Sequence, residues 1–467
     1  MFTYDFDHLA GAERFEILLA SPLVHQIAEL LPVQGITTKP AKLDNVAMLA
    51  LGAATVIWGS DATAEAELRY AWPRVRLLAE RYGVRVPVDP PSVQLFRDYR
   101  QRFLTAAVVE SLSLALEDQA VGVAIALGLL PEDEIDLLDP SALNVIAADG
   151  FWLAEASSVG RMVHDDHINA MAPHRSRGKT TSRVCDFDDQ GKVHGYFFID
   201  FQVRGPEPRR KVCLSTMPAS MGKEMAVVEA GVRRLRSSLG KRFAAFVYDG
   251  AMRGKHHKLF RTLGILTVNK PHGTKQLYQF QTFRGKVVDD KVVITRTVGE
   301  GCVVQLDVTA GLLWQLERRS DGRHYRKRVL EAREVRMTET TRGAFEWEQD
   351  FNLICDVCHE DHLITLDPNG TLKASSKTIN LAETLRILPT NGSLAMRETY
   401  GLRNGTEAYH RQLKTDTGYG DRAGSFARHH VTLDMLLFQL AKNALAYAEH
   451  GPTELVRPNF TVDGVRW

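Results

Sequence analysis

The sequence predicts an α/β protein in which a mixed-sheet core carries a β-rich insertion and follows a mainly α-helical N-terminal domain. Three observations predict this class. Apolar residues recur at helical spacing through the first 140 residues. From about residue 144, short apolar runs alternate with helical patterns, as they do in α/β cores. Between residues 271 and 395, strand-like runs replace that alternation.

The front of the chain is expected to be helical. Segments 12–31 and 68–83 space their apolar residues by three and four, and segment 91–103 opens with Pro and Ser, a helix start signal. Segment 105–130 is apolar nearly all round, which predicts a buried helix. Prolines enclose the acidic stretch that follows, so we place a boundary near residue 140.

The next part of the chain predicts a mixed sheet. A short apolar run, 144–149, ends at Asp149, and segments 182–187 and 193–204 flank the turn DDQG as in a β-hairpin. Segment 210–217 is a third strand. The pattern is completed by a helix at 222–240, a strand at 242–249, a helix at 251–264 and a strand at 265–270.

The predicted organisation has four segments. The β-rich insertion interrupts the core, and helical spacing returns only at 396–415 and 431–448. The segments are an N-terminal helical domain (1–140), the first part of the core (141–270), the insertion (271–395) and the C-terminal part of the core (396–467).

Composition narrows the class of protein. A chain of 467 residues is expected to form two or three domains, and 44% hydrophobic with 25% charged residues is typical of a soluble globular protein. No apolar run reaches the roughly 18 residues needed to span a bilayer. The N-terminus lacks a secretory signal pattern, and five cysteines, an odd number, favour the reducing cytoplasm.

Charge is unevenly distributed. Residues 1–140 hold 11 Lys and Arg against 20 Asp and Glu, a net charge of −9, whereas residues 141–467 carry +10. The basic part of the chain is therefore the part expected to meet an anion, with an ordinary solvated surface as the alternative.

Three acidic residues form the candidate site. Asp149 and Asp249 each end a predicted strand and precede a glycine, and Glu407 lies on a later predicted helix. If the two strands are parallel neighbours, their ends meet at one edge of the sheet. The helix that carries Glu407 could pack against that edge. Three converging carboxylates would bind Mg²⁺ or Mn²⁺, and two such ions can assist phosphodiester chemistry. The alternative is that Asp after a strand simply forms a turn.

Three further residues share a helix face with Glu407. Tyr400, Arg403, Glu407 and Lys414 would fall within an arc of about 60° on a continuous helix. Arg and Lys can contact phosphates and Tyr can donate a hydroxyl, so we expect these groups to bind DNA. A solvated face with i, i+4 ion pairs is the alternative.

This spacing resembles a known signature. Tyr400-x2-Arg403-x3-Glu407-x6-Lys414 is similar to the Y-R-E-K signature of bacterial cut-and-paste insertion-sequence transposases. The segments AADGFW, around Asp149, and VYDGAMRG, around Asp249, resemble those that carry the first two catalytic aspartates of that family. The resemblance covers roughly residues 144–450.

The resemblance implies a fold and a reaction. The fold is a ribonuclease-H-like core with a β-rich insertion before the glutamate. The catalytic triad is Asp149, Asp249 and Glu407, which would hold two divalent ions, Mg²⁺ or Mn²⁺. The reaction is DNA strand cleavage at transposon ends followed by strand transfer, carried out by a homodimer in a synaptic complex on double-stranded DNA.

The resemblance also implies a cellular location for the protein and leaves two alternative functions open. The protein would act in the bacterial cytoplasm, on the nucleoid when bound to DNA. Residues 1–140 have a candidate role in end binding or regulation. A domesticated transposase that acts as a DNA-binding regulator and a metal-dependent nuclease without strand transfer are the alternative functions.

Cysteine and histidine gather within one short stretch. Cys355, Cys358 and His362 match half of a zinc site, with His359 or Cys302 as a fourth ligand and unpaired cysteines as the alternative. This pattern predicts structural Zn²⁺.

Basic and aromatic residues supply further candidates for DNA contact. Basic clusters at 174–183, 204–211, 253–258 and 317–328 could contact phosphates, with Arg253 and Lys255 nearest the predicted triad. Trp314 and Trp347 are either packed in the insertion or stacked on an extruded base.

Overall fold

The structure is a computed structural model that divides into two compact units. The first unit comprises Met1–Leu129, Asp149–Gly231 and Thr406–Trp467, and the second unit comprises Leu130–Ala148 and Val232–Gly405. The structure describes residues 11–32, 35–36, 39–40, 43–58, 61–92, 94–95, 98, 100–101, 104–133, 135–140, 143–154, 183–186, 192–207, 209–220, 223–271, 279–416, 428–452, 459–461 and 464–466.

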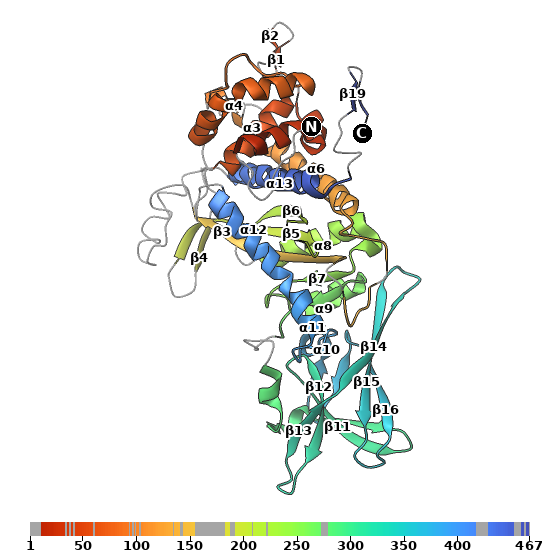
Figure 1. Cartoon of the computed structure of the whole chain (residues 1–467). Coiled ribbons are helices and arrows are strands. Elements are labelled where there is room, and N and C mark those ends of the chain that lie inside the picture. The colour runs from red at the N-terminus through yellow and green to blue at the C-terminus, as the bar shows by residue number, and fades with distance from the viewer. Residues whose placement is uncertain are drawn as a thin grey trace. The chain divides into compact units, whose positions relative to one another are not determined.

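A layer of helices dominates the first unit. Helix α13 is buried along most of its length and packs against α3, α6 and strand β6, as Figure 1 shows. The helices of this layer are α1 (Gly11–Ala20), α2 (Pro22–Glu29), α3 (Asn45–Ile57), α4 (Asp61–Arg81), α6 (Ala106–Ala126) and α13 (Arg428–His450).

Helix α3 is the fully buried helix of this layer. Its residues are buried from Ala47 to Ile57, and Asp44 caps its first turn by accepting the backbone N–H of Ala47 at 2.9 Å. The sequence pattern did not predict this helix. The helix predicted at 105–130 is present as α6, but its expected burial all round is wrong: Leu114 is half-exposed, although α6 also packs against β6.

Two predicted helical segments of the front need adjustment. The segment 12–31 is two helices, because Pro22 cannot donate an intrahelical hydrogen bond and begins α2 instead. The predicted helix at 91–103 falls partly on residues outside the described part of the chain.

The strand pairs within the first unit are antiparallel. Strands β4 (Arg183–Asp186) and β5 (Lys192–Arg204) pair as the predicted hairpin, and β6 (Lys211–Ala219) also pairs with β5. The hairpin and the third strand are therefore confirmed.

The pairs that β7 makes within the second unit are parallel. The first residues of β3 (Val145–Ala154) pair in parallel with β7 (Ala245–Val247), which pairs in parallel with β8 (Leu266–Val268). The strand order is β4-β5-β3-β7-β8, with β6 beside β5. The prediction of a mixed α/β sheet is confirmed.

The prediction that the first core strand ends at Asp149 is wrong. Strand β3 continues to Ala154, and only its parallel pairing with β7 stops early, at the pair Ala147 and Val247. The residues that follow Asp149, Gly150 to Leu153, are as apolar as those before it and can remain extended.

Helices connect the strands of the core. Helix α8 (Glu224–Leu239) follows β6, and α9 (Gly254–Thr262) is the crossover between the parallel strands β7 and β8. Gly240, at φ +55°, ends α8 as predicted, since glycine adopts the left-handed conformation without a steric penalty.

The β-rich insertion lies within the second unit. The insertion contains a five-stranded antiparallel sheet, ordered β10-β11-β12-β13-β9, and a three-stranded sheet, β14-β15-β16 (Figure 1). The two sheets share one buried core. The strands are β9 (Val287–Val288), β10 (Ile294–Val298), β11 (Cys302–Thr309), β12 (Leu312–Arg318), β13 (His324–Val329), β14 (Glu331–Glu339), β15 (Phe345–Ile354), β16 (Asp361–Leu366), β17 (Thr371–Lys373) and β18 (Thr378–Asn380).

Short elements complete the described fold. Helix α10 (Leu381–Thr384) lies in the last part of the insertion, and α11 (Leu394–Gly401) and α12 (Arg403–Asp416) follow α10. Two short strand pairs are β1 (Gly35–Ile36) with β2 (Lys39–Pro40) and β19 (Asn459–Thr461) with β20 (Gly464–Arg466).

Both tryptophans of the insertion are packed in cores. Trp347 is 2% exposed and donates its indole N–H to the carbonyl of Arg261 at 2.7 Å. Trp314 is 1% exposed and donates to the carbonyl of Thr309 at 3.1 Å. Of the two interpretations of these residues, the packed one is confirmed.

The four-segment organisation stays a prediction. The boundaries between the two compact units fall inside strand β3, helix α8 and helix α12. The units are therefore built from several separate stretches of the chain and do not correspond to the four predicted segments. None of the helices that the structure describes has the length and apolar composition that a membrane crossing needs.

Asn443 provides a test of the packing of α13 against β6. Its side-chain amide donates to the carbonyl of Cys213 at 2.8 Å and accepts the backbone N–H of Cys213 at 3.0 Å. Asn443→Leu should lower the free energy of unfolding by about 2–4 kcal/mol, because it leaves two buried backbone groups unpaired. Urea denaturation measures this change.

Gln439→Leu is the graded control, since Gln439 makes one longer hydrogen bond, 3.3 Å, to the carbonyl of Leu214. Its destabilisation should be the smaller one. An Asn443→Leu variant as stable as the wild type would contradict the role of this amide.

Candidate functional site

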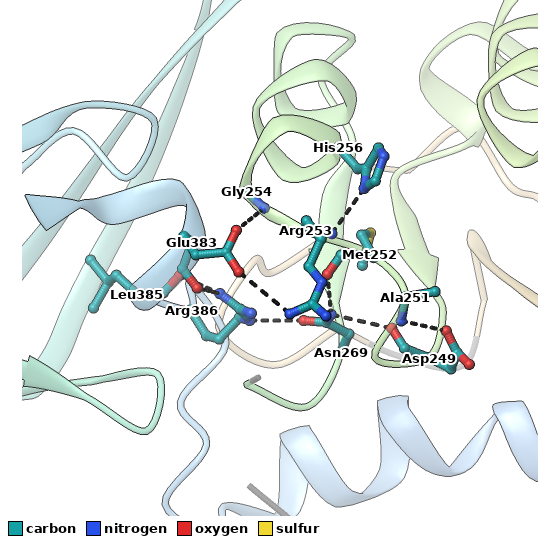
Figure 2. Close-up of polar contacts among 10 residues, drawn as sticks. All are labelled: Asp249, Ala251, Met252, Arg253, Gly254, His256, Asn269, Glu383, Leu385 and Arg386. Atoms are coloured by element: carbon teal, nitrogen blue, oxygen red, sulfur yellow. Dashed lines mark hydrogen bonds and ion pairs between the residues drawn. The ribbon is translucent and has the colours of Figure 1, made fainter. Parts of the chain in front are cut away.

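Asp249 lies just beyond the carboxyl end of β7. The last parallel pair joins Val247 to Ala147, so Asp249 and Asp149 each follow a paired residue by two positions. The Oδ1 atom of Asp249 accepts the backbone N–H of Ala251 at 2.7 Å (Figure 2). This hydrogen bond forms the tight turn that the sequence suggested, and it fixes the carboxylate at the edge of the sheet where ligands of α/β proteins bind.

A buried amide holds the loop that carries Asp249. The Nδ2 atom of Asn269, just after β8, donates to the carbonyls of Asp249 at 3.3 Å and Met252 at 3.1 Å. Its Oδ1 atom accepts Nε of Arg386 at 2.8 Å (Figure 2). Asn269 therefore bridges the aspartate loop to a residue near the C-terminal end of the insertion.

Arg386, the residue that contacts Asn269, is buried. It is 3% exposed, and its Nη1 atom donates to the carbonyls of Glu383 at 3.0 Å and Leu385 at 3.1 Å. Burial lowers the pKa of Arg386 to about 10, and the charge of Glu383 opposes that shift. The guanidinium thus ties the last part of the insertion to the loop that positions Asp249.

Glu383 contacts the start of α9. Its carboxylate accepts the backbone N–H of Gly254 and lies 3.9 Å from Nη1 of Arg253 (Figure 2). Arg253 is half-exposed and has Glu383 as a protein partner, whereas Lys255 is exposed on α9. The DNA contacts expected of these two residues stay predictions.

Asp149 belongs to the first unit and is 7% exposed. Its Oδ1 atom accepts the backbone N–H of Gly150 at 3.0 Å. A Cβ atom at Gly150 would lie 2.5 Å from the ring of Phe197, so only glycine fits beside Asp149 without displacing that ring.

Helix α12 brings Glu407 to the same unit. Glu407 is exposed, while Thr406, Tyr409 and Leu413 form the buried face of the helix. This distribution places the carboxylate on the accessible face and packs the other face into the unit.

His410 anchors α12 through a buried ion pair. Its Nε2 atom lies 2.7 Å from Oδ1 of Asp200, and its ring lies 4.5 Å from that of Phe151 in β3, centroid to centroid. Burial lowers the pKa of His410, but the charge and hydrogen bond of Asp200 and the charge of Asp149 raise it, and the net shift is upward. Asp149 therefore acts electrostatically on the helix that bears Glu407.

The four residues of the signature do not share one continuous helix. Helix α11 ends at Gly401 and α12 begins at Arg403, so Tyr400 stands on a different helix from Glu407 and Lys414. Gly401 and Gly405 weaken helical continuity here, which explains the interruption at Leu402.

The side chains of the signature have different surroundings. Tyr400 packs against the core of the second unit, with Nζ of Lys270 5.2 Å from its ring centroid. Arg403 and Lys414 are partly exposed. Asp149 and Glu407 lie in the first unit and Asp249 in the second.

Three cysteines of the insertion lie together. Ligand atoms of Cys302, Cys355 and Cys358 are within 4.8 Å of one another, as are those of Cys358, Glu360 and His362. The Sγ atom of Cys358 is 3.1 Å from Nε2 of His362. We call Cys302, Cys355 and Cys358 the thiol cluster, and this cluster could bind a metal ion.

The Asp200–His410 pair was not predicted from the sequence. Its signal was a lone carboxylate, Asp200, in the otherwise apolar run YFFIDF of β5, since a buried acid needs a partner. The partner, 210 residues away in the sequence, could not be identified without the fold.

The first unit contains a cavity of about 280 Å³ beside α12. The residues that line it include Lys211, Gln412 and Lys442. Burial and the charge of Lys442 lower the pKa of Lys211 to about 8. Lys442 pairs with Asp416 at 2.6 Å, and Lys211 donates to Gln412 at 3.2 Å, so both ammonium groups have protein partners.

No protein-family model matches this chain, and no curated protein matches it. The geometry and the sequence pattern therefore carry the functional argument.

The His410–Asp200 pair makes a pH-dependent contribution to stability. Because the folded-state pKa of His410 is raised above 6.5, its stabilisation is fully present below the unfolded pKa and is lost as the pH rises through the folded pKa. The destabilisation caused by His410→Gln should thus be largest near pH 5 and shrink toward about pH 8. Urea denaturation across this range measures it.

His25→Gln is the control with the opposite sign. Burial lowers the pKa of His25, so its protonation opposes folding at acidic pH and the variant should gain relative stability as the pH falls. Parallel pH profiles for the two variants would contradict the ion pair at His410.

Proposed function

We propose that this protein is a DNA transposase that cleaves and joins strands at transposon ends with Asp149, Asp249 and Glu407 as its metal-binding triad. The observation that carries the proposal is the parallel register of β3 and β7, which ends two residues before each aspartate. Neighbouring parallel strands bring equivalent positions to one edge of a sheet.

The residues fit hard divalent cations. The three proposed ligands offer only carboxylate oxygens, the donors that Mg²⁺ and Mn²⁺ prefer. When bound, two such ions supply an activated water or hydroxyl nucleophile and stabilise the departing oxygen of the phosphodiester. The chain itself holds the acids: Asn269 and Arg386 fix the Asp249 loop, and His410 fixes α12.

The order of elements supports a ribonuclease-H-like core. Four strands, β3 to β6, precede a helix, a strand, a helix and a strand, and the helix bearing Glu407 follows the insertion. The ribonuclease-H-like core itself is what the resemblance to the transposase family implies.

Double-stranded DNA is the proposed partner. Arg403 and Lys414 on α12 and Lys255 on α9 would contact phosphates beside the triad, and a homodimer would hold two transposon ends in a synaptic complex. Its place of action would be the bacterial cytoplasm, on nucleoid DNA.

We also propose Zn²⁺ as the metal of the thiol cluster. Thiolate and imidazole ligands select this ion over Mg²⁺, and Cys355, Cys358 and His362 supply both kinds. Its role would be structural and separate from the triad.

The decisive assay incubates the purified chain with DNA containing the sequences that flank its coding region and Mn²⁺. Transposition predicts nicks at the ends followed by joined products. Nicks without joining would indicate a nuclease, and binding without either product would indicate a DNA-binding regulator; both results would overturn the proposal.

Glu407→Gln should abolish cleavage and leave DNA binding largely intact. The amide preserves the size of the side chain but weakens a carboxylate ligand to the metal. Cleavage is scored on labelled end DNA, and binding by fluorescence anisotropy. Glu398→Gln, at an exposed position of α11, is the matched control and should cleave normally. Equal cleavage by the wild type and Glu407→Gln would remove Glu407 from the triad.

Lys414→Ala should weaken DNA binding at every sequence and reduce the dependence of log affinity on log salt by about one unit or less. The physical reason is the loss of one phosphate contact. Anisotropy titrations over a series of salt concentrations measure the slope.

Lys241→Ala is the control for this measurement, because Lys241 is exposed and precedes β7, at the opposite end of the strand from Asp249. A slope unchanged in Lys414→Ala, or lowered equally by both variants, would count against a specific contact at Lys414.

A further inference from the structure

Two turns of the insertion meet at the thiol cluster. Cys302 is the first residue of β11, directly after the turn that joins β10 to β11. Cys355 and Cys358 lie in the turn that joins β15 to β16, and His362 is the second residue of β16. The first turn belongs to the five-stranded sheet and the second to the three-stranded sheet.

His362 faces the turn of the other sheet. A Cβ atom at Gly299, in the β10–β11 turn, would lie 2.5 Å from Cε1 of His362. The same imidazole ring has its Nε2 atom 3.1 Å from Sγ of Cys358. The ring therefore lies between the glycine turn that precedes Cys302 and the thiol of Cys358.

The backbone of the β15–β16 turn is shaped to present two thiols. Sγ of Cys355 accepts the backbone N–H of Val357 at 3.4 Å, and the carbonyl of Cys355 accepts the N–H of His359 at 3.1 Å. His359 adopts φ +60°, a left-handed conformation that reverses the chain before β16. This compact turn brings Cys355 and Cys358 together, with His362 following them.

The thiol cluster lies at the edge of the shared core of the two sheets. Cys355 is fully buried in that core and Cys302 packs against it, whereas the neighbouring side chains of Val303, Ile354 and Val357 are 56%, 50% and 70% exposed. The cluster is therefore placed where the core meets solvent.

We propose that Cys302, Cys355, Cys358 and His362 form a closed tetrahedral Zn²⁺ site that fastens the five-stranded sheet to the three-stranded sheet. Cys302 is the ligand that joins the sheets, because the other three all come from the β15–β16 hairpin. Four protein ligands leave no open position for water or substrate, so the site is structural. Metal binding would then contribute directly to folding of the insertion.

Two neighbouring residues are excluded from the ligand set. His359 belongs to neither group of converging ligand atoms. Glu360 lies near Cys358 and His362, but a third thiol, Cys302, gives the sulfur-rich set typical of structural zinc. The inference rests on the zinc assignment proposed above and does not depend on the DNA chemistry.

Metal content is the direct test. The full chain, purified under reducing conditions and dialysed against Zn²⁺-free buffer, should retain about one zinc ion per chain by mass spectrometry. Cys302→Ser should lose most of this zinc, His362→Cys should retain it as a four-thiol site, and His359→Asn, which suits the left-handed backbone, should match the wild type.

Cobalt binding keeps the test independent of whether a variant folds. Co²⁺ titrated into the metal-stripped wild-type chain should produce the visible absorption of a tetrahedral thiolate complex, and Zn²⁺ should displace it. A folded wild type that binds neither ion, or a Cys302→Ser variant with full zinc content, would overturn the four-ligand site. Neither readout uses DNA cleavage, so failure of the zinc site and failure of the transposase proposal are distinguishable.

Discussion

The parallel pairing of β3 with β7 is the constraint on which the account of this protein depends. Three residue pairs, ending at Ala147 and Val247, set the register of the two strands. Because that register is parallel, equivalent residues point to one edge of the sheet, and both aspartates follow at the same offset. A shift by one residue would turn one aspartate to the other face of its strand, so the register determines whether a shared site can form.

Buried polar groups then hold the elements that follow the strands. Asn269 and Arg386 fix the backbone of the Asp249 loop, and Arg386 contributes to this from the last part of the insertion. In the first unit, the Asp200–His410 pair fixes the inner face of α12 and leaves Glu407 exposed. Both arrangements join residues that are far apart in the sequence. The side chains that hold the Asp249 loop and α12 therefore have partners, even though the insertion separates Asp249 from Glu407 along the chain.

Much of the fold could be predicted from local patterns. The β4–β5 hairpin, strands β6 to β8 and helices α8 and α9 follow from period-two and period-three-to-four spacing with glycine stops. Helix α3 was missed because its buried alanines and glycine carry little periodic signal. The interruption at Leu402 and the extension of β3 to Ala154 depend on tertiary packing, which propensity alone does not reveal.

The candidate sites differ in how much the sequence revealed. The cysteine spacing near residue 355 predicted a metal half-site, but only the fold joins Cys302 to it, because the two turns lie on different sheets. Likewise, the acidic residues could be proposed from strand ends, whereas Asn269, Arg386 and His410 emerge only from contacts across more than 100 residues.

The most direct test of the central claim replaces Mg²⁺ with Fe²⁺ and maps where hydroxyl radicals generated at the bound iron cut the polypeptide. The account predicts cuts near residues 149, 249 and 407 together, all suppressed by excess Mg²⁺. Cuts confined to one of these positions, or unaffected by Mg²⁺, would contradict a shared divalent-cation site.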